Sequence, residues 1–168
     1  AVIPAPISRS PLEPDTEAVK LLKSGPTAER LKAIDRLSDP KRLDAAGIGA
    51  LVSALGTEDY PVRQKAEKAL VDIAVAASKD PGTRLRTKEI GLALEKTLGT
   101  DSTNDQIRQS LSSRIVLQNL IHQVSAQSEN RDLIQPVVDK LVRNVVTVSS
   151  SHSSQRSASL SNAALQMA

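Results

Sequence analysis

The side chains that could carry out chemistry are few, and they stand far apart in the sequence. Only two histidines are present, His122 and His152, and cysteine is absent. Without cysteine the chain cannot form a disulfide, a thiolate zinc site or a cysteine nucleophile. Neither histidine belongs to a metal-binding pattern such as HExxH, which places two imidazoles on one face of a helix. We therefore expect two surface histidines and no metal site.

The sequence also contains no cofactor-binding loop, and its one pair of neighbouring carboxylates has a structural explanation. The chain has no GxGxxG and no GxxxxGK[ST] segment, so no glycine-rich loop is expected to cradle a phosphate. Glu58-Asp59 is a pair of neighbouring carboxylates in a predicted turn, where helix capping and solvation account for it. An enzyme requires a nucleophile with its base, a metal cluster or a cofactor loop. The sequence thus predicts a protein that is not an enzyme and has no cofactor, with a helical enzyme holding a cofactor between its helices as the last alternative.

Charge and aromatic content restrict the kind of partner. Lysine and arginine number 22 against 19 acidic residues, and the net charge of +3 is spread evenly along the chain. Tyr60 is the only aromatic residue, so stacking on nucleic-acid bases is not expected. No apolar run approaches the roughly 20 residues that a membrane-spanning helix needs. We therefore expect protein partners, no nucleic acid and no integral membrane segment, with peripheral membrane association left open.

Composition divides the chain into three parts. Residues 1–14 contain four prolines, which favour an extended, polyproline-like arm. Residues 149–168 are rich in serine, and such a composition buries too little apolar surface to fold alone, so we predict a flexible tail. Residues 15–148 form the predicted helical repeat domain. Because the chain begins at Ala1, removal of a targeting peptide is one interpretation, and the localisation stays open between the cytoplasm and an organelle lumen.

Glycine and proline break this domain into helices, and no strand is predicted. The clearest helix covers residues 61–77, where apolar residues recur at three- and four-residue steps after a predicted N-cap at Asp59. Thr103 and Gln106 have the spacing of a capping box. Pro136 is expected to interrupt the last helix. The predicted helices cover residues 15–24, 27–38, 42–55, 61–77, 84–98, 104–125 and 129–147.

Two short segments recur at one period. Leu55-Gly56-Thr57-Glu58 returns 43 positions later as Leu98-Gly99-Thr100-Asp101, and Asp39-Pro40 returns 41 positions later as Asp80-Pro81. A period of about 40 to 47 residues, with two or three helices in each unit, is typical of armadillo and HEAT repeats. Each such unit buries only part of its apolar surface, and stacking on its neighbours completes the core.

Residues 42–78 resemble an armadillo repeat. The family pattern begins with a helix of the form aG-I-x-x-L-V-x-L-L and ends with a long helix of the form A-x-x-A-L-x-N-L-A. The matching residues are Ala46-Gly47-Ile48, Leu51-Val52 and Leu55 in the first helix, and Ala66, Ala69-Leu70 and Ile73-Ala74 in the last. HEAT repeats share a Val-Arg pair such as Val62-Arg63, so the two families are not separated. The resemblance implies an all-α fold, a short α-solenoid of about three armadillo/HEAT-like repeats, with a four-helix bundle as the alternative.

The resemblance also implies a binding surface. Armadillo proteins commonly bind extended peptides on a concave surface, where the asparagine of L-x-N holds the peptide backbone. Asn119 matches that position, and Asp72 occupies it in the unit of residues 42–78. Lys65 and Lys68 share a helical face with Asp72, and His122 shares one with Asn119. The predicted partner-binding residues are Lys65, Lys68, Asp72, Asn119 and His122.

These observations predict a non-catalytic protein-protein interaction or scaffold module of armadillo/HEAT type. The alternative is an accessory, extrinsic structural subunit of a large assembly, membrane-bound or not, in which neighbouring chains order the arm and the tail. Two long ends that cannot fold alone, on either side of a very small solenoid without obvious polar caps, favour the second interpretation.

Overall fold

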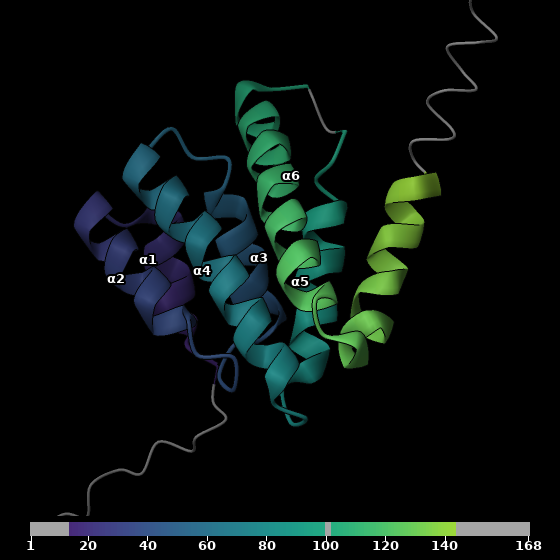
Figure 1. The fold of residues 1–168 in the computed structure, drawn as a ribbon. Helices are drawn as coiled ribbons and strands as arrows, with labels where there is room; N and C mark the ends of the chain where they lie inside the picture. The colour runs from purple at the N-terminus through teal and green to yellow at the C-terminus, as the bar shows by residue number, and fades with distance from the viewer. Residues whose placement is uncertain (1–13, 100–101, 144–168) are drawn as a thin grey trace, which may run out of the picture.

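The computed structural model describes residues 14–99 and 102–143, and this part of the chain is all-α, as predicted. No strand occurs in it. The last helical stretch covers residues 131–143, up to the end of the described part. The preceding elements are α1 (Thr16–Ser24), α2 (Thr27–Leu37), α3 (Ala45–Ala54), α4 (Tyr60–Lys79), α5 (Arg84–Glu95), α6 (Asn104–Ser125) and the 3-10 turn η1 (Ser128–Asn130) (Figure 1).

Four of the helices begin at a side-chain cap. In each, an oxygen of the capping side chain accepts from a backbone N–H in the first turn, which otherwise has no partner in the helix; the caps are Asp15, Asp44, Asp59 and Thr103. The predicted caps at Asp59 and Thr103 are therefore confirmed. At the Thr103 cap, the Gln106 side chain accepts from the backbone N–H of Ser102, the residue before the cap, at 3.2 Å.

The helices are arranged in two layers. Helix α3 packs against both α1 and α5 in one layer, and α4 packs against both α2 and α6 in the other (Figure 1). Across the layers, α1 packs on α2, α3 on α4, and α5 on α6. Each consecutive pair is therefore a hairpin with one helix in each layer.

Residues 131–143 lie against α5 and extend its layer. Lys140 Nζ lies 3.5 Å from Glu95 Oε2, and Arg84 Nη2 lies 2.9 Å from Asp132 Oδ1. Gly91 permits the approach, because a Cβ there would come within 2.8 Å of Val137 Cγ2. The layer that starts with α1 thus contains one more described helix than the layer that starts with α2.

The core between the layers is aliphatic. The predicted apolar stripe of α4 is buried throughout, and Val62, Leu70 and Ile73 are almost fully enclosed. Burying each such side chain contributes about 1.5–3 kcal/mol, so contacts between the layers dominate the stability of these short helices. Helix periodicity in the sequence identified this face correctly.

Pro136 does not interrupt its helix, contrary to the prediction, because residues 131–143 continue through it. A proline here removes one backbone hydrogen bond, which costs about 3 kcal/mol. Burial of Leu133, Ile134 and Val137 around it offsets that cost. Residues 1–13 of the predicted arm and all of the predicted serine-rich tail lie outside the described residues.

The two Leu-Gly-Thr segments follow α3 and α5, which share a layer, but their glycines serve different purposes. Gly99 has a φ of 80°, which side chains strongly disfavour. Gly56 instead lies under the first turn of α6, where a Cβ would come within 2.8 Å of the Asp105 carbonyl oxygen. Thr100 and Asp101, the end of the second segment, lie outside the described residues.

Candidate functional site

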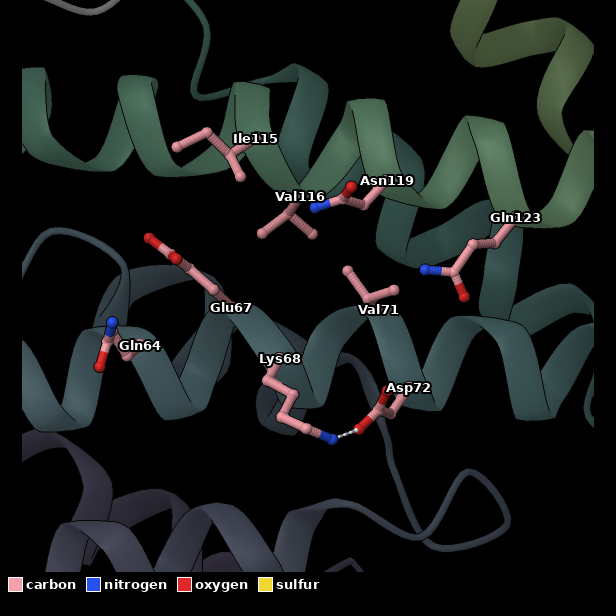
Figure 2. A pocket seen from close by; sticks show the side chains of 9 residues that line it. All are labelled: Gln64, Glu67, Lys68, Val71, Asp72, Ile115, Val116, Asn119 and Gln123. Carbon is pink, nitrogen blue, oxygen red and sulfur yellow. Dashed lines mark hydrogen bonds and ion pairs between the residues drawn. The ribbon is translucent and has the colours of Figure 1, made fainter.

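A groove of about 500 Å³ runs between α4 and α6 (Figure 2). Its floor contains Val71 and Val116, one from each helix, and both are buried. Polar side chains stand above this floor. The full lining consists of Gln64, Glu67, Lys68, Val71 and Asp72 of α4 with Ile115, Val116, Asn119 and Gln123 of α6.

Three of the five predicted binding residues line this groove. They are Lys68, Asp72 and Asn119. Figure 2 shows Asn119 pointing from α6 toward α4, whereas Lys68 and Asp72 stand on the far rim and point away from α6. The structure therefore brings the two positions that match the armadillo asparagine, Asp72 and Asn119, to the same groove but not to the same depth.

The other two predicted residues lie elsewhere. Lys65 Nζ forms an ion pair with Asp35 Oδ2 at 2.6 Å, which joins α4 to α2 rather than reaching α6. His122 is exposed on α6 and is not part of the groove lining. Whether either residue contacts a partner stays a prediction.

Lys68 and Asp72 form an ion pair one helical turn apart. Their side chains are 77% and 60% exposed, so the pair stabilises α4 by only a few tenths of a kcal/mol. A partner can therefore replace either side of this pair at little cost.

Carboxamides are the main polar groups inside the groove. The side-chain carboxamides of Asn119 and Gln123 on α6 have no hydrogen-bond partner within residues 14–99 and 102–143. The side chain of Gln64 on α4 donates to the hydroxyl of Tyr60. Each carboxamide can donate and accept at once. Sequence reasoning missed Gln64 and Gln123, although Gln123 follows Asn119 by one helical turn.

Glu67 sets the charge of the groove. It is half-buried and has no ion pair within the described part of the chain. Figure 2 shows its side chain pointing from α4 toward α6. Because the charges of Lys68 and Asp72 cancel, Glu67 leaves one net negative charge among the lining residues.

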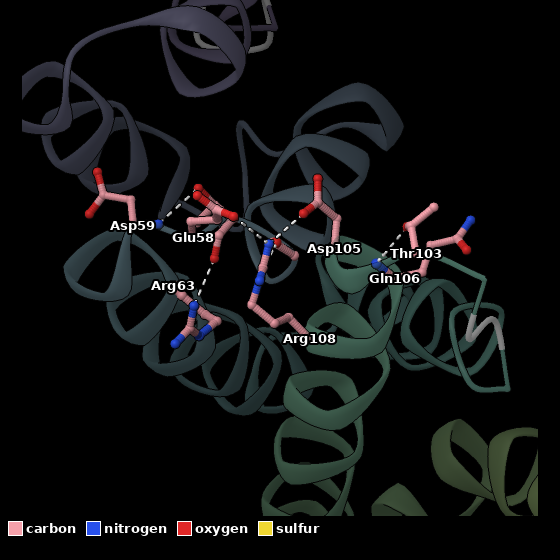
Figure 3. Close-up of polar contacts among 9 residues, drawn as sticks. Glu58, Asp59, Arg63, Thr103, Asp105, Gln106 and Arg108 are labelled. Carbon is pink, nitrogen blue, oxygen red and sulfur yellow. Dashed lines mark hydrogen bonds and ion pairs between the residues drawn. The ribbon is translucent and has the colours of Figure 1, made fainter.

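Polar contacts around Arg108 hold α6 in place at one end of the groove (Figure 3). Its Nε donates to the carbonyl of Gly56 at 3.1 Å, and its Nη2 contacts Asp105 and lies 3.5 Å from Glu58. The neighbouring Gln109 donates to the Val52 carbonyl at 3.0 Å. These bonds tie α6 to the last turn of α3, where the Val52 carbonyl also accepts from the Leu55 N–H at 3.2 Å, and to the turn that follows α3 at Gly56.

The predicted carboxylate pair is used structurally. Glu58 faces Arg108, whereas Asp59 caps α4 and accepts from the hydroxyl of Thr27 at 2.5 Å. Asp59 also lies 3.9 Å from Arg30, so it joins α2 to α4. Capping, which the sequence predicted for this pair, is confirmed for Asp59.

A second acidic residue, Asp15 at the start of α1, is strongly influenced by its surroundings. Burial by itself would raise its pKa, but hydrogen bonds from the Ala18 N–H and the Arg36 guanidinium lower the pKa below its ordinary value. Arg36 Nη2 lies 2.7 Å from Asp15 Oδ1 and also contacts Glu17, and these carboxylates raise the pKa of Arg36. The arrangement ties α1 to α2 and is remote from the groove.

The described helices offer neither a metal centre nor a membrane span. Residues 14–99 and 102–143 contain no group of three or more histidine, aspartate or glutamate side chains placed to hold a metal ion. No helix in the same two ranges is both long enough and apolar enough to cross a bilayer.

Comparison with known proteins gives no relative from which a function could be transferred. No family model matches the chain, and no curated protein or solved structure matches it. The fold and the groove therefore define only a class, an all-helical protein with an open, carboxamide-lined groove between two long helices.

Proposed function

We propose that this protein is a non-catalytic binding or scaffold module of armadillo/HEAT type, and that the groove between α4 and α6 holds an extended segment of a partner protein. Stacked two-helix repeats place alternate helices in the same layer, and the order of α1 to α6 supports such an arrangement. The Leu-Gly-Thr segments after α3 and α5 support the same repeat boundaries. A four-helix bundle would instead gather its helices around one axis.

The carboxamides of the groove carry the proposal. An extended polypeptide presents one N–H and one C=O at almost every residue, and a carboxamide can pair with either group whatever the sequence. Asn119 and Gln123 lie one turn apart on α6, and Gln64 lies on α4 at the Ile115 end of the groove (Figure 2). The apolar floor at Val71 and Val116 suits small aliphatic side chains of the bound segment.

Glu67 adds a preference to this otherwise sequence-tolerant site. A half-buried carboxylate without a cationic partner in the described part of the chain favours a lysine or arginine on the incoming segment. We therefore expect bound segments to carry a basic residue opposite Glu67.

Peptide selection tests the proposal directly. Unstructured peptides are selected from a display library on the full chain, and their affinities are then measured by calorimetry. Asn119→Ala and Gln123→Ala should each weaken binding by about 0.5–1.5 kcal/mol, the net contribution of one hydrogen bond. The matched control is Gln118→Ala, because Gln118 is exposed on the same helix but does not line the groove. Equal affinities for all these variants, or peptides without basic residues, would contradict the proposal.

The alternative function is that of an accessory, extrinsic subunit in a large assembly, membrane-bound or not. Exposed aliphatic side chains on α6 and on residues 131–143 favour it, because a subunit inside an assembly covers such a surface with a neighbour. Size fractionation of a native extract distinguishes the two functions. A permanent subunit elutes only with a large complex, whereas a free module also elutes at its own size.

A further inference from the structure

The groove between α4 and α6 and its nearest charged neighbours are acidic. Within the lining, Lys68 and Asp72 cancel, so Glu67 leaves one negative charge, and Figure 2 shows that its side chain points across the groove. The cluster at the start of α6 adds a second negative charge, because one arginine there faces two carboxylates. These three residues are Arg108, Asp105 and Glu58.

The remaining basic side chains of the two helices do not offset this charge. Arg63 and Lys65 are bonded elsewhere, to a carbonyl of the preceding turn and to α2. Lys79 does not line the groove, and Arg114 lies about 140° around α6 from Asn119. The groove therefore favours a segment that carries a positive charge and no acidic residue.

The chain itself contains such a segment after its last described residue. Residues 144–168 have no acidic side chain and a single arginine, Arg156. Two apolar residues follow it at alternate positions, Ala158 and Leu160, and the residues between them are serines. In an extended chain, alternate side chains lie on one face, so this pattern presents one basic and two apolar groups together.

The spacing of this pattern fits α4. Alternate side chains of an extended chain are about 6.6 Å apart, and residues one helical turn apart lie about 6 Å apart along the helix. Glu67 and Val71 are one turn apart and line the same groove. Arg156 can therefore face Glu67 while Ala158 faces the apolar floor at Val71.

The segment is also within reach. Residues 131–143 run parallel to α5, since Asp132 contacts Arg84 at its first residue and Lys140 contacts Glu95 at its last. The described part thus ends on the side of the domain where α6 begins (Figure 1). Arg156 follows 13 positions later, a distance that an extended chain spans with up to about 43 Å. The path around α6 crosses about three helix spacings, roughly 30 Å.

The N-terminal residues fit the groove less well. Arg9 precedes Pro14 by five positions, which allows at most about 17 Å, and α2 and α4 lie between α1 and the groove. Pro11 has no N–H for a carboxamide to bind, and Glu13 would bring a second acidic charge. Charge and reach therefore both favour the C-terminal segment.

We propose that residues 154–160 bind in the groove of their own chain, with Arg156 on Glu67 and Ala158 on the floor at Val71, and that a partner segment must displace them. This inference rests on the proposed function of the groove as a site for extended segments. A short tether holds the segment near the groove at an effective concentration on the order of millimolar, so a weak contact is sufficient. The tail then excludes weak partners and admits strong ones.

The chain has no cysteine, so a disulfide between two introduced cysteines reports where the segment lies. In the full chain, Gln64→Cys is combined with Ser154→Cys, because Ser154 and Gln64 precede Arg156 and Glu67 by two and three positions. The control combines Gln118→Cys with Ser154→Cys, since Gln118 is exposed on α6 outside the groove. In a glutathione buffer, the groove pair should show an effective concentration at least about tenfold above that of the control pair.

Charge reversal identifies the contact. Arg156→Glu should reduce disulfide formation by the groove pair to the level of the control pair, and adding Glu67→Lys should restore it. Peptides selected on the native chain should bind Arg156→Glu at least about threefold more tightly, because the tail no longer occupies the groove. Circular dichroism confirms that each variant remains folded.

Equal disulfide formation by the two pairs, or full formation with Arg156→Glu, would overturn the proposal. If peptides still bind and lose affinity in Asn119→Ala, the groove keeps its proposed function and only the tail contact fails. If the groove pair forms selectively but no peptide binds, the tail contact stands and the proposed function fails. Disulfides between two chains that increase with protein concentration would place the segment in a second copy and overturn the intramolecular contact.

Discussion

Replacing Gly56 by alanine tests how α6 is seated on the end of α3. A Cβ at this buried position would lie 2.8 Å from the carbonyl oxygen of Asp105, whereas ordinary contacts to a Cβ begin at 3.4 Å. The oxygen belongs to the backbone in the first turn of α6, so it cannot rotate away. Removing this close contact requires α6 or the turn at Gly56 to move by about 0.6 Å. Overpacking of this kind costs about 1–3 kcal/mol.

A second glycine provides the matched control. Gly49 lies in α3, and a Cβ added there would have no atom within 4 Å, so the same substitution meets no obstacle. Alanine in a helix interior is favoured over glycine by about 0.5–1 kcal/mol. We therefore expect Gly49→Ala to raise the free energy of unfolding. Gly56→Ala should lower it, although the loss of chain entropy in the unfolded state offsets up to about 1 kcal/mol of the strain.

Urea unfolding followed by far-ultraviolet circular dichroism measures both changes, with the slope of the transition as a check on two-state behaviour. The decisive result is the sign. If Gly56→Ala stabilises the protein as Gly49→Ala does, the close approach of α6 to the end of α3 is refuted. The groove should respond as well, because α6 forms one of its walls: peptides selected on the native chain should bind Gly56→Ala more weakly than Gly49→Ala.

Two further predictions concern charged contacts between helices. Arg108→Ala should lower the free energy of unfolding by about 1–2 kcal/mol, because it leaves the Gly56 carbonyl without its donor. The control Arg114→Ala should change the free energy of unfolding by less than about 0.5 kcal/mol. Equal effects of the two substitutions in urea unfolding would refute the role of Arg108. The pKa of Asp15 is lower in the folded than in the unfolded state, so its contribution to stability is present above the unfolded value of about 3.9 and is lost as the pH falls through the folded value. Asp15→Asn should therefore destabilise the protein at neutral pH and lose this effect in acid. In thermal unfolding, a difference in unfolding temperature between the native chain and the variant that stays the same at every pH would contradict the lowered pKa of Asp15.

Local chemistry explains which features could be predicted. The cap at Asp59 involves a side chain and a backbone N–H three residues apart, and the buried stripe of α4 follows from the period of one helix. Both depend only on residues close in sequence. The all-α class and these two features were accordingly predicted correctly.

Contacts between distant residues explain what could not be predicted. Periodicity identifies which face of a helix is buried. It does not predict which residues at the border of that face will contact a neighbouring helix. The armadillo resemblance predicts Asp72 and the shared helical face predicts Lys65 and Lys68 as contacts. The structure instead points Glu67 toward α6 and pairs Lys65 with Asp35 of α2. Pro136 continues its helix for a related reason, because burial of its neighbours outweighs a local preference.

The sequence by itself therefore determined the helices, most of their ends and the apolar face of α4, since capping and periodicity act over three or four residues. Only the tertiary structure decided which polar side chains share the groove, which glycine lies under a neighbouring backbone and which end of the domain exposes aliphatic residues. Each of these depends on how one helix is placed against another, and that placement is determined by packing between residues as far apart as Gly56 and Asp105.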